Sequence, residues 1–204
     1  MSLLRKFQGL NNFIYNENYY KLFYGKNQIG YVHRKIAKYI IRNVKGIYLL
    51  EQNLYLENTS EIKLKKIILK ITETLSEKKN FFIPADELFS CRITIDGKEL
   101  FKLDRKLVEF LGIRGYGVHL IAYVKQQNSY KLWVPKRNKN KLASPSKFDN
   151  SVAGGVRAGE DIFGALEREA YEEAGLKKEQ LNNVKLVGTL NYNWKNSPYT
   201  LRRD

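Results

Sequence analysis

A short acidic stretch near the end of the chain combines residue types and spacing that could hold a divalent cation. Carboxylate oxygens are the ligands that hard cations such as Mg²⁺ and Mn²⁺ prefer, and glycines let backbone groups approach a ligand closely. A cation bound in this way can also accept the oxygens of a diphosphate. The stretch therefore predicts a site that holds metal against a diphosphate. It reads Gly154-x5-Glu160-x7-Arg168-Glu169-x2-Glu172-Glu173-x-Gly175.

A helix must position these carboxylates. The pattern predicts a helix from Ile162 to Ala174, with Asp161 as its N-cap and Gly175 in the left-handed conformation that ends it. One face of the helix is expected to pack on a sheet, opposite the metal-binding face. The residues assigned to the packing face are Ile162, Phe163, Leu166 and Ala170.

Three glutamates share the other face of this helix. Residues three or four positions apart project from one side, so Glu169, Glu172 and Glu173 are expected to lie together and to repel one another until a cation enters. Arg168 lies on a neighbouring face, where its planar guanidinium could pair with Glu160 or Glu172 and hold the cluster in place. We therefore interpret Arg168 as an orienting residue and not as a ligand.

The chain is expected to form two domains, with a boundary between Leu111 and Gly115. Residues 1–111 predict a small α+β domain of unknown role, and residues 112–204 predict the domain that carries the acidic helix. The elements expected in the first domain are a strand at Gln28–His33, a helix at Arg34–Arg42, one or two strands at Ile47–Leu56, a helix at Leu64–Leu75, a hairpin turn at Gly97 and a helix at Phe101–Phe110.

The second domain is expected to contain strands before and after the acidic helix. Ala153, Gly154 and Gly155 belong to the strand that leads into the helix, and their backbone groups can come close to a metal or a phosphate. The expected strands are Tyr116–Val124, Tyr130–Pro135, Asn150–Val156 and Val184–Asn191, with a turn at Ser144–Ser146 and a loop at Trp194–Pro198.

The composition describes a globular chain with a strong positive charge. The chain has 204 residues, 43% of them hydrophobic, and 36 Lys and Arg against 21 Asp and Glu give a net charge of +15. Such a charge raises nucleic-acid binding as an alternative. The basic residues are spread along the chain, however, so a solvated surface or a basic entrance for phosphorylated small molecules is favoured.

Cysteine and histidine are too scarce for several kinds of site. The single cysteine, Cys91, excludes an internal disulfide and multi-cysteine zinc sites, and we interpret it as a packing residue. His119 is interpreted as a core or pocket residue and not as a metal ligand. The sequence has no run of eighteen apolar residues that would predict a membrane span and no signal-peptide stretch, so the expected location is cytoplasmic.

The acidic stretch resembles the Nudix box, the signature of hydrolases that act on nucleoside diphosphates linked to other moieties and on related diphosphates. The resemblance extends to flanking phrases and suggests one Nudix subgroup, in which a domain of uncharacterised function precedes the hydrolase. Relatives in this subgroup include the Nudix part of thiamine pyrophosphokinase-fused proteins. The resemblance implies an α/β/α sandwich with a mixed sheet. The flanking phrases are Gly112–His119, Leu132–Arg137 and Phe148–Gly155.

The resemblance also implies roles for individual residues. The reaction would be attack of water on a phosphorus of a diphosphate, with Mg²⁺ or Mn²⁺ as the cofactor. Arg168 and the three glutamates of the shared helix face are the candidate catalytic residues, and Arg168 and Glu160 would support the metal ligands. The candidate metal-binding groups are Glu169, Glu172, Glu173, Glu160 and the carbonyl of Ala153.

The subgroup suggests thiamine diphosphate or a damaged derivative as the substrate, cleaved to the monophosphate and phosphate. Trp133 could stack on a heteroaromatic ring or pack in the core, and the sequence leaves both open. Lys136 and Arg137 could meet a phosphate. Gly154 and Gly155 are the other candidate substrate-binding residues.

The chain departs from the family after the box, because only 28 residues follow Leu176. The Nudix domain is therefore expected to be truncated at its C-terminus, and a homodimer or a complementing C-terminal fragment could complete its pocket. Two alternatives to an active hydrolase stay open: a truncated or degenerate Nudix protein without turnover, and an RNA-directed Nudix protein. A small-molecule diphosphate is the expected partner, with nucleic acid not favoured and no membrane.

Overall fold

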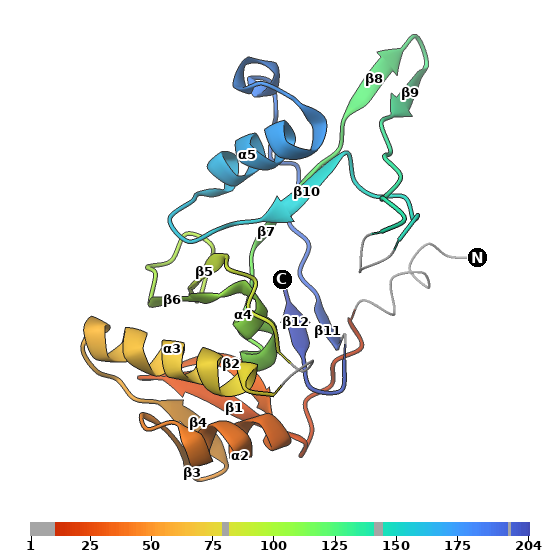
Figure 1. Cartoon of the computed structure of the whole chain (residues 1–204). Coiled ribbons are helices and arrows are strands. Elements are labelled where there is room, and N and C mark those ends of the chain that lie inside the picture. The colour runs from red at the N-terminus through yellow and green to blue at the C-terminus, as the bar shows by residue number, and fades with distance from the viewer. Residues whose placement is uncertain (1–10, 79–81, 141–144, 196) are drawn as a thin grey trace. The chain divides into compact units, whose positions relative to one another are not determined.

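A computed structural model describes residues 11–78, 82–140, 145–195 and 197–204, and these residues form a mixture of helices and strands (Figure 1). The predicted α+β class is confirmed. The chain divides into two compact units, one made of Met1–Gly115 with Thr189–Asp204 and the other of Tyr116–Gly188. The predicted domains, 1–111 and 112–204, stay a prediction, and each compact unit is described by itself.

A four-stranded sheet organises the first unit. Its strands are β1 (Tyr19–Tyr24), β2 (Asn27–His33), β3 (Ile47–Leu50) and β4 (Asn53–Leu56), in the order β2-β1-β4-β3. The β1–β2 and β3–β4 pairs are antiparallel, whereas β1 and β4 are parallel, so the sheet is mixed. Glu51 and Gln52 connect β3 to β4 with φ angles of 46° and 70°, the positive values that a tight two-residue hairpin turn requires.

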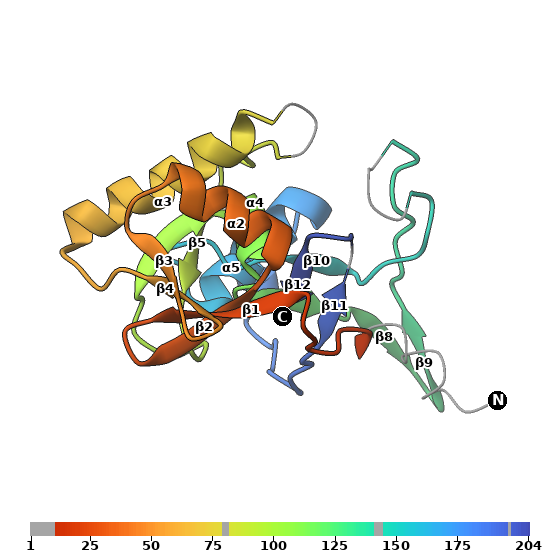
Figure 2. The same ribbon diagram turned by 90° about the horizontal axis from the view of Figure 1, so that it is seen from below.

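Two helices of the first unit, α2 (Arg34–Asn43) and α3 (Glu61–Ser76), lie side by side (Figures 1 and 2). The predictions of both helices are confirmed. Helix α2 begins at His33, whose Nδ1 accepts a hydrogen bond from the Lys35 amide at 3.2 Å, and it buries one apolar face. The buried residues of α2 are Ile36, Ala37 and Ile40.

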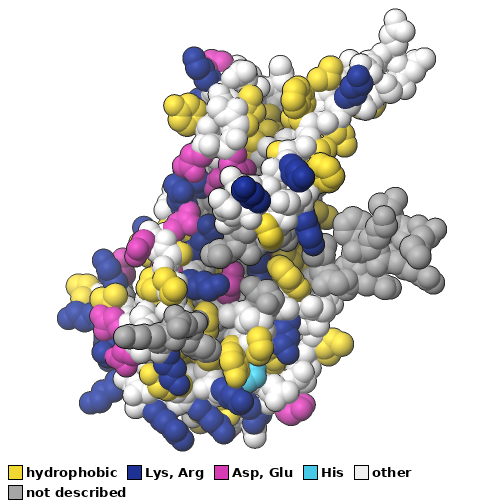
Figure 3. Space-filling model, turned by 45° about the vertical axis from the view of Figure 1, so that its right-hand side comes forward, with side chains coloured by type: hydrophobic (Ala, Val, Ile, Leu, Met, Phe, Trp, Pro, Cys, Tyr) yellow, Lys and Arg dark blue, Asp and Glu magenta, His cyan; other side chains and the backbone are white. Residues whose placement is uncertain are grey.

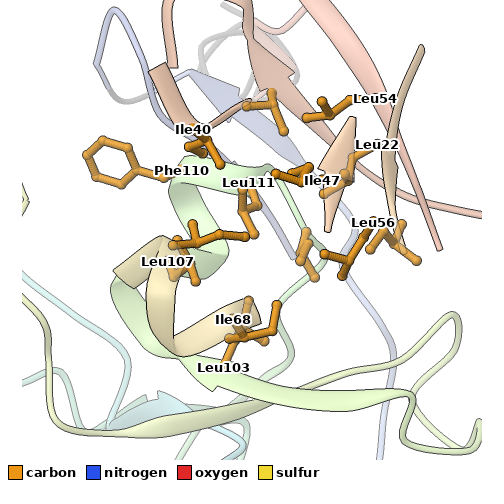
Figure 4. Close-up of a cluster of buried hydrophobic side chains, with 14 of the residues drawn as sticks. Leu22, Ile40, Ile47, Leu54, Leu56, Ile68, Leu103, Leu107, Phe110 and Leu111 are labelled. Carbon is orange, nitrogen blue, oxygen red and sulfur yellow. The ribbon is translucent and has the colours of Figure 1, made fainter. Parts of the chain in front are cut away.

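The core of the first unit joins the sheet to its helices (Figure 4). Leu22 and Leu54 come from neighbouring strands, and they share one buried cluster with Ile40 from α2 and Ile68 from α3. Because these branched side chains leave water together, their burial supplies the main stabilisation of the unit.

Three further elements of this unit are β5 (Leu88–Cys91), β6 (Phe101–Asp104) and α4 (Arg105–Leu111). The prediction of a single helix at Phe101–Phe110 is wrong in its first turn. The first four residues instead pair with β5, and Asp104 then caps α4 by accepting a hydrogen bond from the Lys106 amide at 2.7 Å. The predicted turn at Gly97 lies between the two strands, and its amide donates to the Thr94 carbonyl at 3.0 Å.

The end of the chain contributes β11 (Asn193–Lys195) and β12 (Leu201–Arg203) to the first unit. The predicted strand at Val184–Asn191 is wrong, because described residues 184–191 are not a strand. The predicted loop at 194–198 begins inside β11, and its residue 196 lies outside the described residues. The apolar pattern misplaced the strand because β11 depends on antiparallel pairing with β12, which no local pattern encodes.

The second unit has a smaller set of elements. They are β7 (Gly117–Leu120), β8 (Tyr123–Gln126), β9 (Ser129–Leu132), β10 (Val152–Gly155), α5 (Ile162–Ala174) and the 3-10 helix η2 (Lys178–Leu181). Strands β7 and β10 form an antiparallel pair, against which α5 packs, and β8 and β9 form a separate hairpin. The mixed sheet therefore lies in the first unit, and the sheets of the second unit are antiparallel pairs.

The prediction of one strand at Tyr116–Val124 is wrong, because the strand is interrupted after β7. The amide of Ala122 donates a hydrogen bond to Ser151 Oγ at 2.8 Å, which takes the chain out of the β7–β10 ladder. The strand predicted at Tyr130–Pro135 ends at Leu132. Of the predicted turn at 144–146, the last two residues are in a turn and residue 144 lies outside the described residues.

Cys91 is fully buried in the core of the first unit, which confirms its interpretation as a packing residue. Burial raises the pKa of its thiol to about 12, so the thiol is protonated at neutral pH. Across the part of the chain that the structure describes, every helix is too short or too polar to cross a membrane.

We expect Gly112→Ala to destabilise the first unit more than Gly25→Ala. Both glycines have left-handed φ angles, 55° and 56°, so alanine costs about 1–2 kcal/mol at either position. At Gly112, however, the new Cβ would also overlap the carbonyl oxygen of Tyr31, which adds about 1–3 kcal/mol. At Gly25 the nearest atom, from Asn58, is 3.8 Å away. Urea unfolding followed by circular dichroism measures the two losses, and equal losses would contradict the close approach at Gly112.

Candidate active site

Helix α5 forms as its sequence predicts. The carboxylate of Asp161 accepts a hydrogen bond from the Gly164 amide at 2.7 Å, which satisfies a backbone donor of the first turn. Gly175 ends the helix with φ of 64°, and its amide donates to the Tyr171 carbonyl at 3.0 Å. The predicted bounds of the helix and both of its caps are confirmed.

The packing face of α5 differs from the prediction at one residue. Leu166 and Ala170 are buried, as predicted, and Ala165 is buried beside them. Phe163 is 52% exposed, so its assignment to the packing face is wrong. Helical spacing alone places Phe163 on the side of Leu166 and Ala170, three and seven residues further on, so the pattern could not show that this ring in the first turn is exposed.

Arg168 is the centre of the acidic face. Its Nε and Nη2 donate to the two carboxylate oxygens of Glu160 at 2.7 and 3.0 Å, a bidentate pair. Its Nη1 donates to Glu169 at 2.6 Å and lies 3.4 Å from a Glu172 oxygen, and Nη2 also donates to the Gly155 carbonyl at 2.8 Å. The predicted pairing of Arg168 with Glu160 and Glu172 is confirmed, and the pair with Glu169 adds to it.

The electrostatics of this group follow from the bidentate pair. The hydrogen bond from Arg168 is the main cause that holds the pKa of Glu160 below its ordinary value of 4.5, and partial burial opposes this effect. The same hydrogen bond raises the pKa of Arg168. Both side chains are mostly shielded from water, with 23% of Glu160 and 16% of Arg168 exposed. Both groups are therefore charged at neutral pH.

Arg157 is a second cation of the site that the sequence pattern did not single out. Its amide donates to Glu160 at 3.0 Å, and its guanidinium lies 3.7 Å from Glu172. The signal that could have found it is a basic residue inside the short segment between Gly154 and Glu160, where a turn brings it back to the helix. The acidic face thus has two arginines next to it.

Strand β10 supplies the backbone side of the site. A Cβ at Gly154 would overlap the carboxyl group of Glu169, so this carboxylate can lie against the strand only because Gly154 has no side chain. The amide of Ala153 donates to a Glu173 oxygen at 3.0 Å. The strand therefore meets two of the three glutamates that were predicted to share a helix face.

The carboxylate oxygens of the site are of the type that a hard divalent cation prefers, but they do not converge on one point. In the described residues, no three Asp, Glu, His or Cys side chains converge closely enough to hold a metal ion. Arg168 contacts Glu169, and Glu173 is turned toward the strand. Glu172 keeps 46% of its side chain exposed and makes the longest contact with Arg168. Glu169, Glu172 and Glu173 are the carboxylates that would hold a hard divalent cation here.

Comparison with protein families bears on this region. Residues 114–201 match the NUDIX domain. The predicted Nudix superfamily is therefore supported, and the thiamine-related subgroup stays a prediction. Nudix hydrolases generally use divalent metal ions, which agrees with the oxygen donors of the acidic face.

Similar proteins support the same assignment. Nudix hydrolase 20, chloroplastic, from Arabidopsis thaliana is 29% identical over 178 residues, which cover 80% of this chain and 47% of the relative. Nudix hydrolase 24, chloroplastic, from the same plant is 28% identical over 80% of this chain and 46% of the relative. A Nudix hydrolase from Deinococcus radiodurans is 31% identical over 34% of this chain and 41% of the relative.

The chain spans about half the length of the two plant relatives. These two relatives and the bacterial one are all named Nudix hydrolases. The match covers the acidic stretch and the strands on either side of the β8–β9 hairpin.

The predicted substrate-binding residues beyond the glycines lie after β9. Trp133 is 67% exposed, which excludes core packing in the structure and leaves ring stacking as a prediction. Lys136 forms an isolated bridge with Phe148, and Arg137 is ion-paired with Asp149. All three residues belong to the segment that follows the hairpin, and their role in substrate binding stays a prediction.

His119 lies in the part of the chain that matches the NUDIX domain, residues 114–201, which we call the Nudix region. Its side chain is exposed, so its interpretation as a core residue is wrong. Its Nδ1 lies 2.8 Å from the side-chain nitrogen of Asn150, and this contact satisfies one ring nitrogen. His119 also pairs with Ala153 across the β7–β10 ladder, with its side chain outside the core. The apolar residues on either side of it misled the sequence interpretation.

We expect the pair of Glu160 and Arg168 to make stability depend on acid pH. The pKa of Glu160 is lower in the folded chain than its ordinary value of 4.5. Its ionised form therefore contributes stability that is fully present above about pH 4.5 and is lost as the pH falls through the lower folded-state pKa. The free energy of unfolding of Glu160→Gln should lie about 1–3 kcal/mol below that of the wild type at neutral pH.

Chemical denaturation between pH 3 and pH 7 measures this difference. Glu167→Gln is the matched control, because Glu167 is on the same helix and its ion pair with Lys178 is exposed. The difference for Glu160→Gln should shrink toward pH 3, and the control should stay close to the wild type throughout. A difference for Glu160→Gln that is constant over this range would contradict the pairing.

We expect Gly154→Ala to weaken cation binding without unfolding the Nudix region. The new Cβ would overlap the Glu169 carboxyl group, which is the flexible end of a side chain and can move aside. Displacing a supporting or binding carboxylate should weaken Mn²⁺ binding by about 10- to 100-fold. Gly188→Ala is the control, because its Cβ would meet nothing within 4 Å. Free Mn²⁺ measured by electron paramagnetic resonance reports the affinity, and equal affinities in the two variants would exclude Glu169 from the cation site.

Proposed function

We propose that the Nudix region of this chain is a metal-dependent hydrolase of a diphosphate bond in a small molecule, which it cleaves to a monophosphate and inorganic phosphate. The observation that carries this proposal is the arrangement around Arg168. One guanidinium holds Glu160 and Glu169 by short hydrogen bonds, and Glu169 lies against the glycine-containing strand β10. The arrangement places carboxylates beside the glycine backbone of β10, where no side chain blocks the approach of a diphosphate.

The side chains have different tasks in this proposal. Arg168 orients the carboxylates and stays protonated, so it takes no part in proton transfer. Glu172 is more exposed than Glu160 and Glu169, so its carboxylate can reach a cation or a water molecule from solvent. Glu173 is held near the strand by the Ala153 amide. Mg²⁺ or Mn²⁺ bound by these carboxylates would polarise phosphoryl oxygens and lower the pKa of a bound water.

Backbone groups of β10 are suited to the substrate side of the reaction. Gly154 and Gly155 have no side chains to block the approach of a phosphate, and the Gly155 carbonyl is already used by Arg168. The basic residues of the surface raise the local concentration of an anionic substrate. Both effects favour a substrate with two linked phosphates over a neutral ester.

Thiamine diphosphate or a damaged derivative is the substrate we propose at the finer level. The support for it is the sequence resemblance to the thiamine-related Nudix subgroup, together with the exposed ring of Trp133, which is open to stacking on a heteroaromatic ring. Lys136 lies three residues further along the chain and can meet a phosphate. A cytoplasmic location is part of the same proposal, whereas the two plant relatives are named chloroplastic.

We expect phosphate release from diphosphates to require Mg²⁺ or Mn²⁺ and the acidic face. The panel contains thiamine diphosphate, a nucleoside diphosphate and a nucleoside diphosphate sugar, and the product is measured as inorganic phosphate, with phosphatase added for the sugar. Glu172→Gln and Glu173→Gln should each lower the rate by about 100-fold, because each removes a charged ligand.

Glu167→Gln is the matched control for both variants. It makes the same change of charge on the same helix, but Glu167 is paired with Lys178, away from Arg168. It should keep the wild-type rate. If the folded wild-type chain hydrolyses none of the compounds, the hydrolase proposal is contradicted and a Nudix protein without turnover is favoured. Equal rates in all three variants would place the chemistry elsewhere.

A further inference from the structure

The β8–β9 hairpin carries a surface that the hydrolase proposal does not use. Its strands pair in antiparallel register, with Tyr123 opposite Leu132 and Lys125 opposite Tyr130. Because side chains alternate between the faces of a strand, these four residues share one face. Every residue of β8 and β9 is exposed, so no described element covers this face. Figure 1 shows the hairpin extending away from β10 within its unit.

Aromatic rings on this face are open to solvent. Tyr123 is 59% exposed and Tyr130 is 63% exposed, and their ring centroids lie 5.3 Å apart at an interplanar angle of 79°. An edge-to-face pair holds both rings in fixed orientations and leaves ring surface for another aromatic group. The apolar surface of two neighbouring exposed rings is unfavourable in water, and a partner that covers it gains free energy, so the rings indicate an interaction surface.

The charge around the hairpin is strongly positive. The sequence from residue 123 to residue 149 contains seven Lys and Arg and a single acidic residue, Asp149, which is ion-paired with Arg137. Lys125 and Lys131 lie on the hairpin itself and are exposed. The complementary partner of this segment is therefore negatively charged. The basic residues are Lys125, Lys131, Lys136, Arg137, Lys139, Lys141 and Lys147.

The base of the hairpin is anchored by Ser151. Its hydroxyl accepts a hydrogen bond from the Ala122 amide at 2.8 Å and donates to the Trp133 carbonyl at 2.6 Å. The Trp133 amide in turn donates to the Ala122 carbonyl at 2.9 Å. One side chain thus ties together the two ends of the hairpin, which gives the exposed face a defined geometry at its root.

We propose that the β8–β9 hairpin binds single-stranded nucleic acid. Bases stack on Tyr123 and Tyr130, and Lys125 contacts a phosphate on the same face. Lys131, which lies opposite Val124 on the other face, adds positive charge to the hairpin. Single-stranded chains are bound without sequence preference by this combination of aromatic rings and basic residues. The proposal is independent of the hydrolase site, because none of its four residues belongs to the acidic face.

Two other anionic or apolar partners fit the hairpin less well. A membrane-inserting hairpin presents apolar residues at its tip, but the tip here is Gln126-Gln127-Asn128-Ser129, and in Figure 3 the end of the projection is neither hydrophobic nor charged. An apolar protein partner would meet the ammonium group of Lys125, which lies opposite Tyr130 on the aromatic face. A nucleic-acid strand offers bases to the two rings and a phosphate to this lysine.

The test is fluorescence anisotropy with labelled 15-mers of uridine and of thymidine, bound to the whole chain at several salt concentrations. The double variant Tyr123→Leu with Tyr130→Leu keeps apolar side chains but removes the rings, and it should weaken binding by about tenfold or more. Lys125→Gln with Lys131→Gln should also reduce the slope of log affinity against log salt by about 0.7, since Lys125 neutralises one phosphate.

Lys38→Gln with Lys45→Gln is the matched control, because it removes the same charge from exposed positions of the first unit. Binding of either 15-mer that is weakened by the hairpin variants and not by this control supports the proposal. Equal weakening by the control would reduce the effect to net charge and overturn it. The proposal would also be overturned if neither 15-mer bound at low salt. It would be overturned as well if the tyrosines were needed only for binding to vesicles that contain phosphatidylserine.

Measuring phosphate release by the same variants distinguishes a failure of the nucleic-acid proposal from a failure of the hydrolase proposal. The hairpin variants should release phosphate from the diphosphate panel at the wild-type rate, because Tyr123, Tyr130, Lys125 and Lys131 have no contact with Arg168 or its carboxylates among the described interactions. Loss of oligonucleotide binding with normal turnover therefore concerns the hairpin alone, and loss of turnover in Glu172→Gln with normal oligonucleotide binding concerns the acidic face alone.

Discussion

The bidentate contact between Arg168 and Glu160 is the constraint on which the acidic site depends. Several carboxylates cannot lie this close together in a partly shielded site without a cation between them. Arg168 supplies that cation permanently, and it also bonds to the Gly155 carbonyl. One side chain thereby connects the turn before α5, the helix and strand β10.

Close packing of the helix makes this connection geometrically possible. Ala165 and Ala170 are fully buried on the face of α5 that packs toward the strands, and small residues there let the helix axis approach β10. The same closeness places the Glu169 carboxyl against Gly154. The position of the Glu169 carboxyl group therefore depends on the small side chains of Ala165 and Ala170 on the packing face of α5.

Helix α5 could be predicted to the residue because its information is local: Asp161, Gly175 and the spacing of the glutamates lie within one segment. The role of Arg157 could not, since it depends on the path of a turn. Strand β6 was mistaken for helix because its pairing with β5 overrides the local apolar spacing. The sequence predicted the pairing of Arg168 with Glu160 or Glu172, but it did not predict the contacts of Arg168 with Glu169 and with the Gly155 carbonyl.

The buried thiol of Cys91 can report on local opening of the first unit. The chain has a single cysteine, and a protonated thiol without access to solvent does not react with alkylating reagents. Modification therefore has to wait until β5 and its surroundings open, and its rate measures how often they do. The second unit contains no cysteine. One sulfur atom therefore reports on local opening of the first unit.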